Sequence, residues 1–255
     1  MGNYSNCSRQ QQQKLGIEKG TAIVWMDNWV LNQPFRNWPA QPGVPDGHRM
    51  LFRFFESQRN LVVLSSSNSA QRETYDRACR DANVPIIQRR GGGGTVVLGP
   101  GCLVLTFAFY AKELFANQRY FHLINSLWAD ALSTAGVSGL VTRGHSDLAC
   151  GDKKVAGTSL FRRKHLVVYQ GSLLVEPDFG MISELLQHPS REPDYRQGRS
   201  HREFLTSLKQ LGYSGSTQGL AEVCTDYFLR NAPERLAHDF ADPTLIPKHQ
   251  RLINF

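Results

Sequence analysis

The chain has 255 residues, of which 41% are hydrophobic and 20% charged, a composition typical of a globular protein with a sizeable core. The formal net charge of +7 favours an acidic partner or an anionic ligand, but the sequence contains no long Lys/Arg block and no recognisable nucleic-acid-binding module. No apolar run approaches the roughly 20 residues that cross a bilayer. We therefore expect neither a nucleic-acid nor a membrane partner. A monomer is also expected.

The N-terminal residues and the cysteines bear on the cellular compartment. Residues 1–20 are polar, include the run Gln10–Gln13 and lack the apolar stretch of a secretory signal, so we expect a flexible arm here. The five cysteines are scattered and form no Cys-x-x-Cys pair, which argues for reduced thiols and against a disulfide framework or a zinc site. They are Cys7, Cys79, Cys102, Cys150 and Cys224. A cytoplasmic protein is the expectation.

The first hundred residues alternate apolar runs with polar connections. A Pro/Gly-rich loop occupies residues 33–47, and Asn68 or Ser69 is a plausible helix cap. The patterns predict a buried helix over 21–31, strands over 51–55 and 61–64, and a polar helix between 69 and 82.

The rest of the chain mixes short strands with helices. Cys102–Ala108 has the length of a strand buried on both faces, and apolar residues at helical spacing from Phe121 to Leu132 stop at Gly136. Ser200–Glu203 reads as a capping box that opens a helix reaching Leu208. Further strands are predicted over 139–141, 147–149, 153–156, 158–162 and 166–174, and a last helix over 220–229. The mixture indicates an α+β fold with a mixed, largely antiparallel sheet flanked by helices.

A run of four glycines, Gly91–Gly94, follows Arg89 and Arg90 and precedes the strand-like Thr95–Leu98. Each glycine costs backbone entropy and buries no side chain, so such a run suits a place where a ligand lies directly against backbone N–H groups. The two arginines add planar donors for carboxylate or phosphate. A flexible hairpin tip is the alternative interpretation. The run matches neither a P-loop nor a dinucleotide fingerprint.

A second group of motifs lies further along the chain. Asp147–Leu148 is followed by Lys154–Ser159, which reads Lys-x-Ala-Gly-x-Ser, and then by Gln170–Leu174, which reads Gln-Gly-x-Leu-Leu. With the glycine run upstream, these patterns resemble the biotin/lipoate ligase catalytic domain. They are most similar to the lipoate–protein ligases, whose own loop reads Arg-Arg-x-Ser/Thr-Gly-Gly-Gly-Ala-Val. The resemblance covers about residues 50–180.

This resemblance implies a fold and a domain organisation. It implies a biotin/lipoate ligase-like catalytic domain over residues 21–235, a C-terminal tail over 236–255 that packs on it, and no C-terminal accessory domain. Two departures from the family pattern stand out. Leu98–Gly99 replaces a His-Asp pair, so that Leu98–Val104 is similar to the His-Gly-Pro-Gly-Gln-Leu-Val of octanoyltransferases without the histidine. Ser146 stands where the family has asparagine.

The resemblance also implies roles for individual residues. Arg89 is the better match for the family arginine that binds the nucleotide phosphate. Arg90 is one residue away from that position. Asp147 matches the aspartate near the nucleotide and, indirectly with ATP, the metal. Lys154 matches the lysine that touches both the acyl carbonyl and the phosphate, and Lys153 is interpreted as solvated. The remaining matched residues hold the acyl-adenylate or lie beside the lysine: Gly92, Gly93, Gly94, Thr95, Val96, Val97, Gly157 and Ser159.

The function implied is that of an ATP-dependent lipoate–protein ligase, which uses ATP and Mg²⁺ to activate lipoate or octanoate and acylates a lysine of an acidic acceptor protein. The alternative is a cysteine-dependent octanoyl or lipoyl transferase of the same fold, which takes the acyl group from an acyl-carrier protein. Cys150 precedes the motif lysine and is its candidate nucleophile, although a small residue at a strand end is the simpler interpretation. Cys102 is expected in the core. A biotin ligase is disfavoured by the absence of that branch's Gly-Arg-Gly loop, and a non-catalytic sensor or scaffold is a further alternative.

Overall fold

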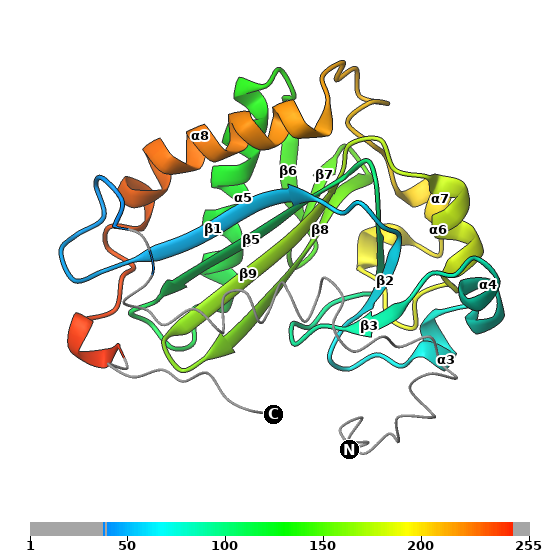
Figure 1. Cartoon of the computed structure of the whole chain (residues 1–255), viewed down its shortest axis with the longest axis horizontal. Coiled ribbons are helices and arrows are strands. Elements are labelled where there is room, and N and C mark those ends of the chain that lie inside the picture. Colours follow the sequence, from blue (N-terminus) through cyan, green and yellow to red (C-terminus); the bar gives the residue numbers. More distant parts are fainter. Residues whose placement is uncertain (1–37, 39, 247–255) are drawn as a thin grey trace.

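The computed structural model describes residue 38 and residues 40–246 of the chain, as a large sheet, a small sheet and the helices around them (Figure 1). The arm expected over residues 1–20, the helix expected over 21–31 and the last nine residues of the expected tail lie outside the described residues. Among the described helices, none is long and apolar enough to cross a membrane.

The large sheet has six strands in the order β1-β5-β9-β8-β7-β6, and every neighbouring pair is antiparallel. Its strands are β1 (Met50–Glu56), β5 (Cys102–Tyr110), β6 (Leu140–Arg143), β7 (Asp147–Cys150), β8 (Lys153–Arg163) and β9 (Leu166–Leu174). β5 lies in the sheet interior, and all nine of its residues are buried. This confirms the strand predicted from the apolar run at Cys102–Ala108.

The small sheet has three strands in the order β3-β2-β4: β2 (Leu61–Leu64), β3 (Ile86–Gln88) and β4 (Val96–Leu98). β2 pairs in parallel with β3 and antiparallel with β4. A parallel pair needs a crossover connection, which here consists of α3 (Ala70–Glu73) and α4 (Asp76–Asp81). The glycine run connects β3 to β4. The two sheets together bear out the α+β fold with mixed, largely antiparallel strands.

Two long helices, α5 (Asn117–Thr134) and α8 (Thr217–Leu236), cover one face of the large sheet (Figure 1). Trp128 from α5 and Phe228 from α8 are fully buried in the main hydrophobic core, together with inward-facing residues of β5 and β9. α5 ends where the sequence predicts, because Gly136 adopts the left-handed φ of +86° that favours glycine. The aromatic side chains of this core meet mostly edge to face, an arrangement favoured by their quadrupoles.

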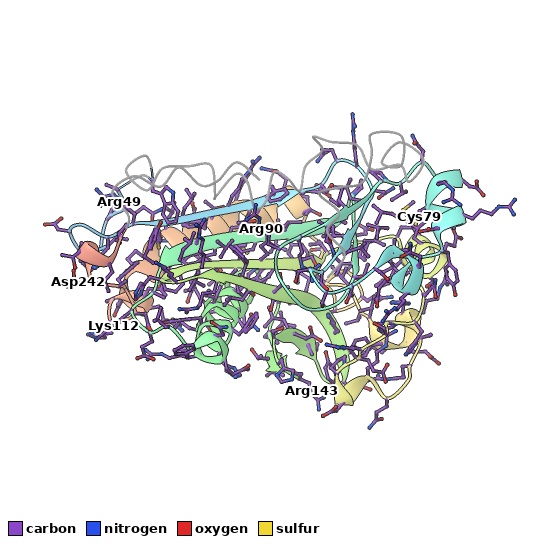
Figure 2. All side chains as sticks on the ribbon, turned by 90° about the horizontal axis from the view of Figure 1, so that it is seen from below. Arg49, Cys79, Arg90, Lys112, Arg143 and Asp242 are labelled. Atoms are coloured by element: carbon purple, nitrogen blue, oxygen red, sulfur yellow. The ribbon has the colours of Figure 1, made fainter. Side chains whose placement is uncertain are left out.

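The end of the molecule that carries the small sheet is closed by short helices: α6 (Phe179–Leu185), η3 (Asp194–Arg196) and α7 (His201–Phe204), while η4 (Pro243–Leu245) follows α8. Figure 2 shows Cys79 of α4 at this end and Arg49 and Asp242 at the opposite end of the large sheet. Cys79 packs in a separate cluster with apolar residues of the small sheet and of α6. This end therefore has its own core beside the main one.

Three local predictions were wrong in extent. The polar helix expected over 69–82 is broken at Thr74, which forms a β-bridge with Leu186. The strands expected over 153–156 and 158–162 are one strand, β8. The capping box at Ser200 is present, but α7 ends at Phe204 because the next residues extend along the sheet, with the amide of Thr206 donating to the carbonyl of Lys154 at 2.9 Å.

Candidate functional site

A pocket of about 400 Å³ lies between the two sheets and the segment that follows α6. Its apolar lining comes from the small sheet, from β5 and β9, and from α6: Val63, Val96, Val97, Leu98, Val104, Leu174, Ile182 and Leu186. Its charged lining comes mainly from β7, β8 and residues 191–201, with Arg89 added from the start of the glycine loop, which we define as residues 91–94. The pocket thus offers both an apolar part and a charged part to a ligand.

The side chain of Arg89 organises the glycine loop from inside. It is buried, and its Nη2 donates hydrogen bonds of 2.7 Å to the carbonyls of Gly92 and Gly94. Its Nη1 donates to the carbonyl of Val63 at 3.3 Å. Gly93 has a φ of +94°, and a Cβ there would lie 3.2 Å from Arg89 Nη2. The loop conformation is therefore set by Arg89 and needs glycine at position 93.

Two glycines of this loop leave open space. A Cβ added to Gly92 or to Gly94 would meet no atom within 4 Å beyond its neighbours in the chain, and neither residue has a positive φ. Gly94 lines the pocket, whereas Gly92 is exposed outside the lining. The space beside Gly94 is where a ligand can approach the backbone closely, as the sequence analysis expects of the run.

Lys154 and Asp147 form an ion pair in the pocket wall. Lys154 Nζ lies 2.8 Å from Asp147 Oδ1, and the two side chains are 22% and 12% exposed. The second oxygen of the carboxylate, Oδ2, accepts a hydrogen bond of 3.0 Å from the hydroxyl of Tyr195. Burial and then the charge of Asp147 raise the pKa of Tyr195, so this phenol remains a donor at neutral pH. Asp147 thus holds the ammonium group in one position.

A bulge places Lys154 beside Gly157. Residues three apart in a regular strand face opposite sides of the sheet, yet Lys154 and Gly157 both line the pocket. The pairing register shifts between Leu148 and Ala149, which pair with Ala156 and Lys154, so β8 carries one extra residue at this point. A Cβ on Gly157 would lie 3.0 Å from Lys154 Nζ. Glycine at 157 therefore makes room for the ammonium group.

A buried amide supports the loop that leads into Asp147. Asn125 of α5 is fully buried, and its Nδ2 donates to the carbonyl of Ser146 at 2.9 Å and to Thr142 Oγ1 at 3.2 Å. Its Oδ1 accepts a hydrogen bond of 2.6 Å from the hydroxyl of Tyr169. The hydroxyl of Thr158 donates to the same Ser146 carbonyl at 2.6 Å. Ser146 therefore contributes its backbone carbonyl to a network that fixes the position of Asp147.

The remaining wall of the pocket is formed by residues 189–205, which we call the closing segment. Buried Glu73 joins it to the loop, because its carboxylate accepts hydrogen bonds from Thr95 Oγ1 and from Ser190 Oγ. Arg196 is 5% exposed and stacks 5.0 Å from the ring of Phe204. His201 lines the pocket, and burial, followed by the charges of Arg196, His188 and Lys154, lowers its pKa to about 4. The imidazole is therefore neutral at physiological pH.

Most residues that the sequence proposes for the site do line this pocket: Arg89, Gly93, Gly94, Thr95, Val96, Val97, Asp147, Lys154, Gly157 and Ser159. Two do not. Gly92 is exposed, and Arg90 lies with its guanidinium 5.9 Å from the ring of Phe161 on β8. Lys153, interpreted as solvated, is exposed and outside the lining.

The family model of the lipoyl protein ligase A/B catalytic domain matches residues 37–229, about three quarters of the chain. The chain belongs to this family. The match begins next to the first described residue and includes β1 to β9, the closing segment and most of α8. It confirms the family resemblance expected from the glycine run and from the motifs around Lys154.

Solved structures show the same fold at low identity. The bi-partite lipoate protein ligase of Thermoplasma acidophilum, analysed with its E2 lipoyl domain, has a TM-score of 0.65 and 16% identity, over 92% of this chain and 95% of that one. A lipoate-protein ligase A bound with ATP has a TM-score of 0.65 and 20% identity, over 86% and 83%. P. falciparum LipL1 in complex with lipoate has a TM-score of 0.57 and 13% identity, over 78% and 51%.

Some residues in and around this pocket were not expected from the sequence. Asn125 lies on the apolar face of α5, and Tyr195, Arg196 and His201 lie beyond the last family motif that the sequence revealed. The only signal near them was the capping box at Ser200, which predicts a helix start but not which pocket that helix faces. A polar residue within an apolar helical stripe, as at Asn125, is the signal that could have been used.

The cysteines of this family member lie away from the pocket lining. Cys102 is buried, and burial raises the pKa of its thiol to about 11, which disfavours a thiolate at neutral pH. Cys150 is half-buried at the end of β7, where it pairs with Lys153. Neither these two nor Cys79 and Cys224, the other cysteines in the described part of the chain, line the pocket.

Proposed function

We propose that this protein activates lipoate or octanoate with ATP as an acyl-adenylate and transfers the acyl group to a lysine of an acceptor protein. One observation carries the proposal. The ammonium of Lys154, held by Asp147 at 2.8 Å, stands in the wall of a pocket that combines an apolar part with a charged part and with the backbone of a glycine loop. An apolar chain that ends in a carboxylate has the matching chemistry.

In both proposed steps, negative charge develops on oxygen atoms. A carboxylate oxygen of the acid attacks the α-phosphorus of ATP and pyrophosphate leaves. The amine of the acceptor lysine then attacks the acyl carbonyl, AMP leaves, and the nitrogen loses a proton as the amide forms. Lys154 would stabilise the phosphoryl and carbonyl oxygens in these steps, because a fixed cation in a partly dry site acts most strongly where charge develops.

The glycine loop and the start of β4 would bind rather than react. Gly94, Thr95, Val96 and Val97 line the pocket and would hold the acyl-adenylate, with the conformation of their backbone set by the bonds that Arg89 makes to the loop. Gly157 and Ser159 would form the floor beside Lys154. The related structures, of which one holds ATP and another lipoate, support these two ligands.

Mg²⁺ would be held mainly by the phosphates of ATP. The described residues contain no group of three or more His, Cys, Asp or Glu that could hold a metal ion. Each oxygen of Asp147 has one partner, Lys154 or Tyr195, and keeps a second lone pair with which it could contact a metal. A site with few carboxylates suits Mg²⁺ bound to nucleotide, where the ion would offset phosphate charge.

The cysteine-dependent transferase remains the competing mechanism. It requires a thiol within reach of the acyl carbonyl, and neither Cys102 nor Cys150 belongs to the pocket lining. The adenylating ligase needs no thiol, so the positions of these cysteines favour it. The net charge of +7 favours an acidic acceptor domain, and we place the reaction in the cytoplasm with a monomeric enzyme.

The experiment that tests the proposal compares two donors. The protein is incubated with lipoate, a lipoyl-acceptor domain and Mg²⁺, with and without ATP, and in parallel with an octanoyl carrier protein and no ATP. Intact mass spectrometry then reads the acceptor. We expect an added lipoyl mass only with ATP. Acylation from the carrier protein without ATP would replace the proposal by the transferase.

A further inference from the structure

The pocket lining includes four arginine or lysine residues: Arg89, Lys154, Arg191 and Arg196. Arg89 gives its Nη2 to two loop carbonyls, and Lys154 is ion-paired with Asp147. Arg191 is exposed to solvent, where its charge is screened. Arg196 is buried like Arg89, but among the described residues its guanidinium is held through Nε, while Nη2 has no hydrogen-bond partner.

The contacts of Arg196 leave part of its donor set unused. Nε donates to the carbonyl of Arg199 at 2.9 Å and lies 3.4 Å from Glu192 Oε2. Glu192 also accepts a hydrogen bond of 2.8 Å from the amide of Gly198. Arg196 Nη2 is enclosed and has no hydrogen-bond partner in the part of the chain that the structure describes. An unsatisfied buried donor of a charged group lowers stability, because the group has lost its water without gaining a partner.

We propose that Arg196 binds the oxyanion of the ligand in this pocket, which is either the carboxylate of the acid or the phosphate of the nucleotide. The identity of the ligand rests on the proposed function. Carboxylate and phosphate both match the two-pronged donor geometry of a guanidinium. Because Nη2 is enclosed, contact with the anion requires a small movement of the closing segment on binding, and the contact of the guanidinium with the ring of Phe204 keeps it oriented.

The charge balance of the pocket supports this role. The Lys154–Asp147 pair is close, at 2.8 Å, and neutral as a whole, whereas Arg196 Nε lies 3.4 Å from Glu192 Oε2, and Glu192 also accepts hydrogen bonds from the amide of Gly198 and from His188. The looser pairing leaves more of the Arg196 charge for an incoming carboxylate or phosphate. Arg196 supplies a second cation from the closing segment, while Lys154 belongs to β8. The ligand oxyanion would then lie between two cations that come from distant parts of the chain.

A purely structural role for Arg196 makes a different prediction. Arg196 also ties the closing segment together through Arg199, Glu192 and Phe204. If that were its whole function, its replacement would lower the melting temperature and weaken charged and uncharged ligands alike. An oxyanion-binding residue discriminates between them. The test therefore pairs each anionic probe with a neutral analogue.

The experiment uses the full chain as wild type, Arg196→Gln, Arg196→Met and Arg202→Gln. Met keeps an apolar side chain against Phe204 if Gln fails to fold, and Arg202 is an exposed arginine on α7 outside the pocket lining. Calorimetry measures the affinity for inorganic pyrophosphate, for lipoate against lipoamide, and for AMP against adenosine. Circular dichroism and thermal melting report the fold of each variant.

We expect Arg196→Gln and Arg196→Met to weaken pyrophosphate and at least one of lipoate and AMP by about tenfold or more, the effect of losing a charge-assisted bond. Lipoamide and adenosine should bind as before, and Arg202→Gln should match the wild type. The anion that loses affinity identifies which oxyanion Arg196 holds. Unchanged affinity for every anionic probe, or equal losses for charged and neutral ligands, would overturn the proposal.

The same titrations separate this inference from the proposed function. If the wild type binds pyrophosphate through Arg196 but neither lipoate nor AMP, the oxyanion site stands and the ligase assignment fails. If the wild type ligates lipoate with ATP and Arg196→Gln does so with unchanged affinities, the ligase assignment stands and the role of Arg196 is refuted. A wild type that binds no anionic probe refutes both.

Discussion

Lys154 Nζ and Asp147 Oδ1 lie 2.8 Å apart on neighbouring strands of the large sheet, at a point where a bulge shifts the pairing of β7 with β8. The carboxylate is also held by the hydroxyl of Tyr195 at 3.0 Å, and its loop is anchored by Asn125. The ammonium group is thus fixed before any ligand arrives, and electrostatic stabilisation of a transition state requires such preorganisation.

Replacing this lysine should abolish the chemistry. Lys154→Ala should lower both adenylate formation and acyl transfer by about 10²-fold or more, because it removes a positioned cation. Pyrophosphate release and intact mass of the acceptor measure the two steps. Lys153→Ala is the matched control, since Lys153 is the exposed neighbour, and its activity should stay within about two-fold. Equal losses from the two variants would show that the wrong lysine has been chosen.

In the proposed mechanism the hydroxyl of Tyr195 would act through Asp147, to which it donates a hydrogen bond. Tyr195→Phe keeps the ring contacts with Phe204 and Arg143 but frees one carboxylate oxygen. We expect kcat to fall by roughly tenfold with little change in KM for lipoate, because one hydrogen bond to a charged group is worth about 1.5–3 kcal/mol and only part of it affects the lysine. Steady-state kinetics measure the split. A rise in KM at constant kcat would assign Tyr195 to ligand binding.

The glycine loop can be tested without backbone strain. Gly94→Val places a side chain in the open space beside the pocket, and Gly92→Val does so outside it; neither position has a positive φ. We expect Gly94→Val to abolish the thermal shift caused by saturating lipoate and ATP, and Gly92→Val to retain it. Both variants should melt close to the wild type in the absence of ligands. A full shift in Gly94→Val means that the loop does not cradle the ligand.

The thiol at Cys150 should be dispensable. Cys150→Ser should keep ATP-dependent lipoylation within about three-fold, since Cys150 lies outside the pocket lining. After acid denaturation of the wild-type reaction mixture, no acyl adduct should remain on the enzyme, because an adenylate dissociates whereas a thioester stays attached. Peptide mapping of an acyl adduct to Cys150 or Cys102 would contradict the adenylating mechanism.

His201 should make stability depend on pH. In the folded protein, burial and three nearby positive groups lower its pKa from 6.5 to about 4. Between these values the unfolded state binds more protons than the folded state, so the free energy of unfolding falls as pH drops from about 6.5 towards 4. Urea unfolding of His201→Gln at pH 7 and pH 5 should show a smaller drop than the wild type. His122→Gln, at an exposed position of α5, should behave like the wild type.

The sequence by itself determined the local parts of the site. The glycine run, and the close spacing of Lys154, Gly157 and Ser159, are contiguous in the chain, so their motifs could be recognised without knowing the fold. The buried strand at Cys102–Ala108 and the long helix around Trp128 were predictable for the same reason, since hydrophobic periodicity reports local burial.

Other features depended on how the chain folds as a whole. Periodicity would place Lys154 and Gly157 on opposite faces of β8, and only the bulge opposite Leu148 and Ala149 brings them together. The sequence motif suggests Arg89 as a phosphate ligand, whereas the tertiary structure directs its Nη2 to loop carbonyls. Arg196 reaches the pocket from about forty residues beyond Lys154, because the closing segment folds back over β8. Local sequence patterns carry no information on such long-range contacts, which packing and charge pairing decide in the folded chain.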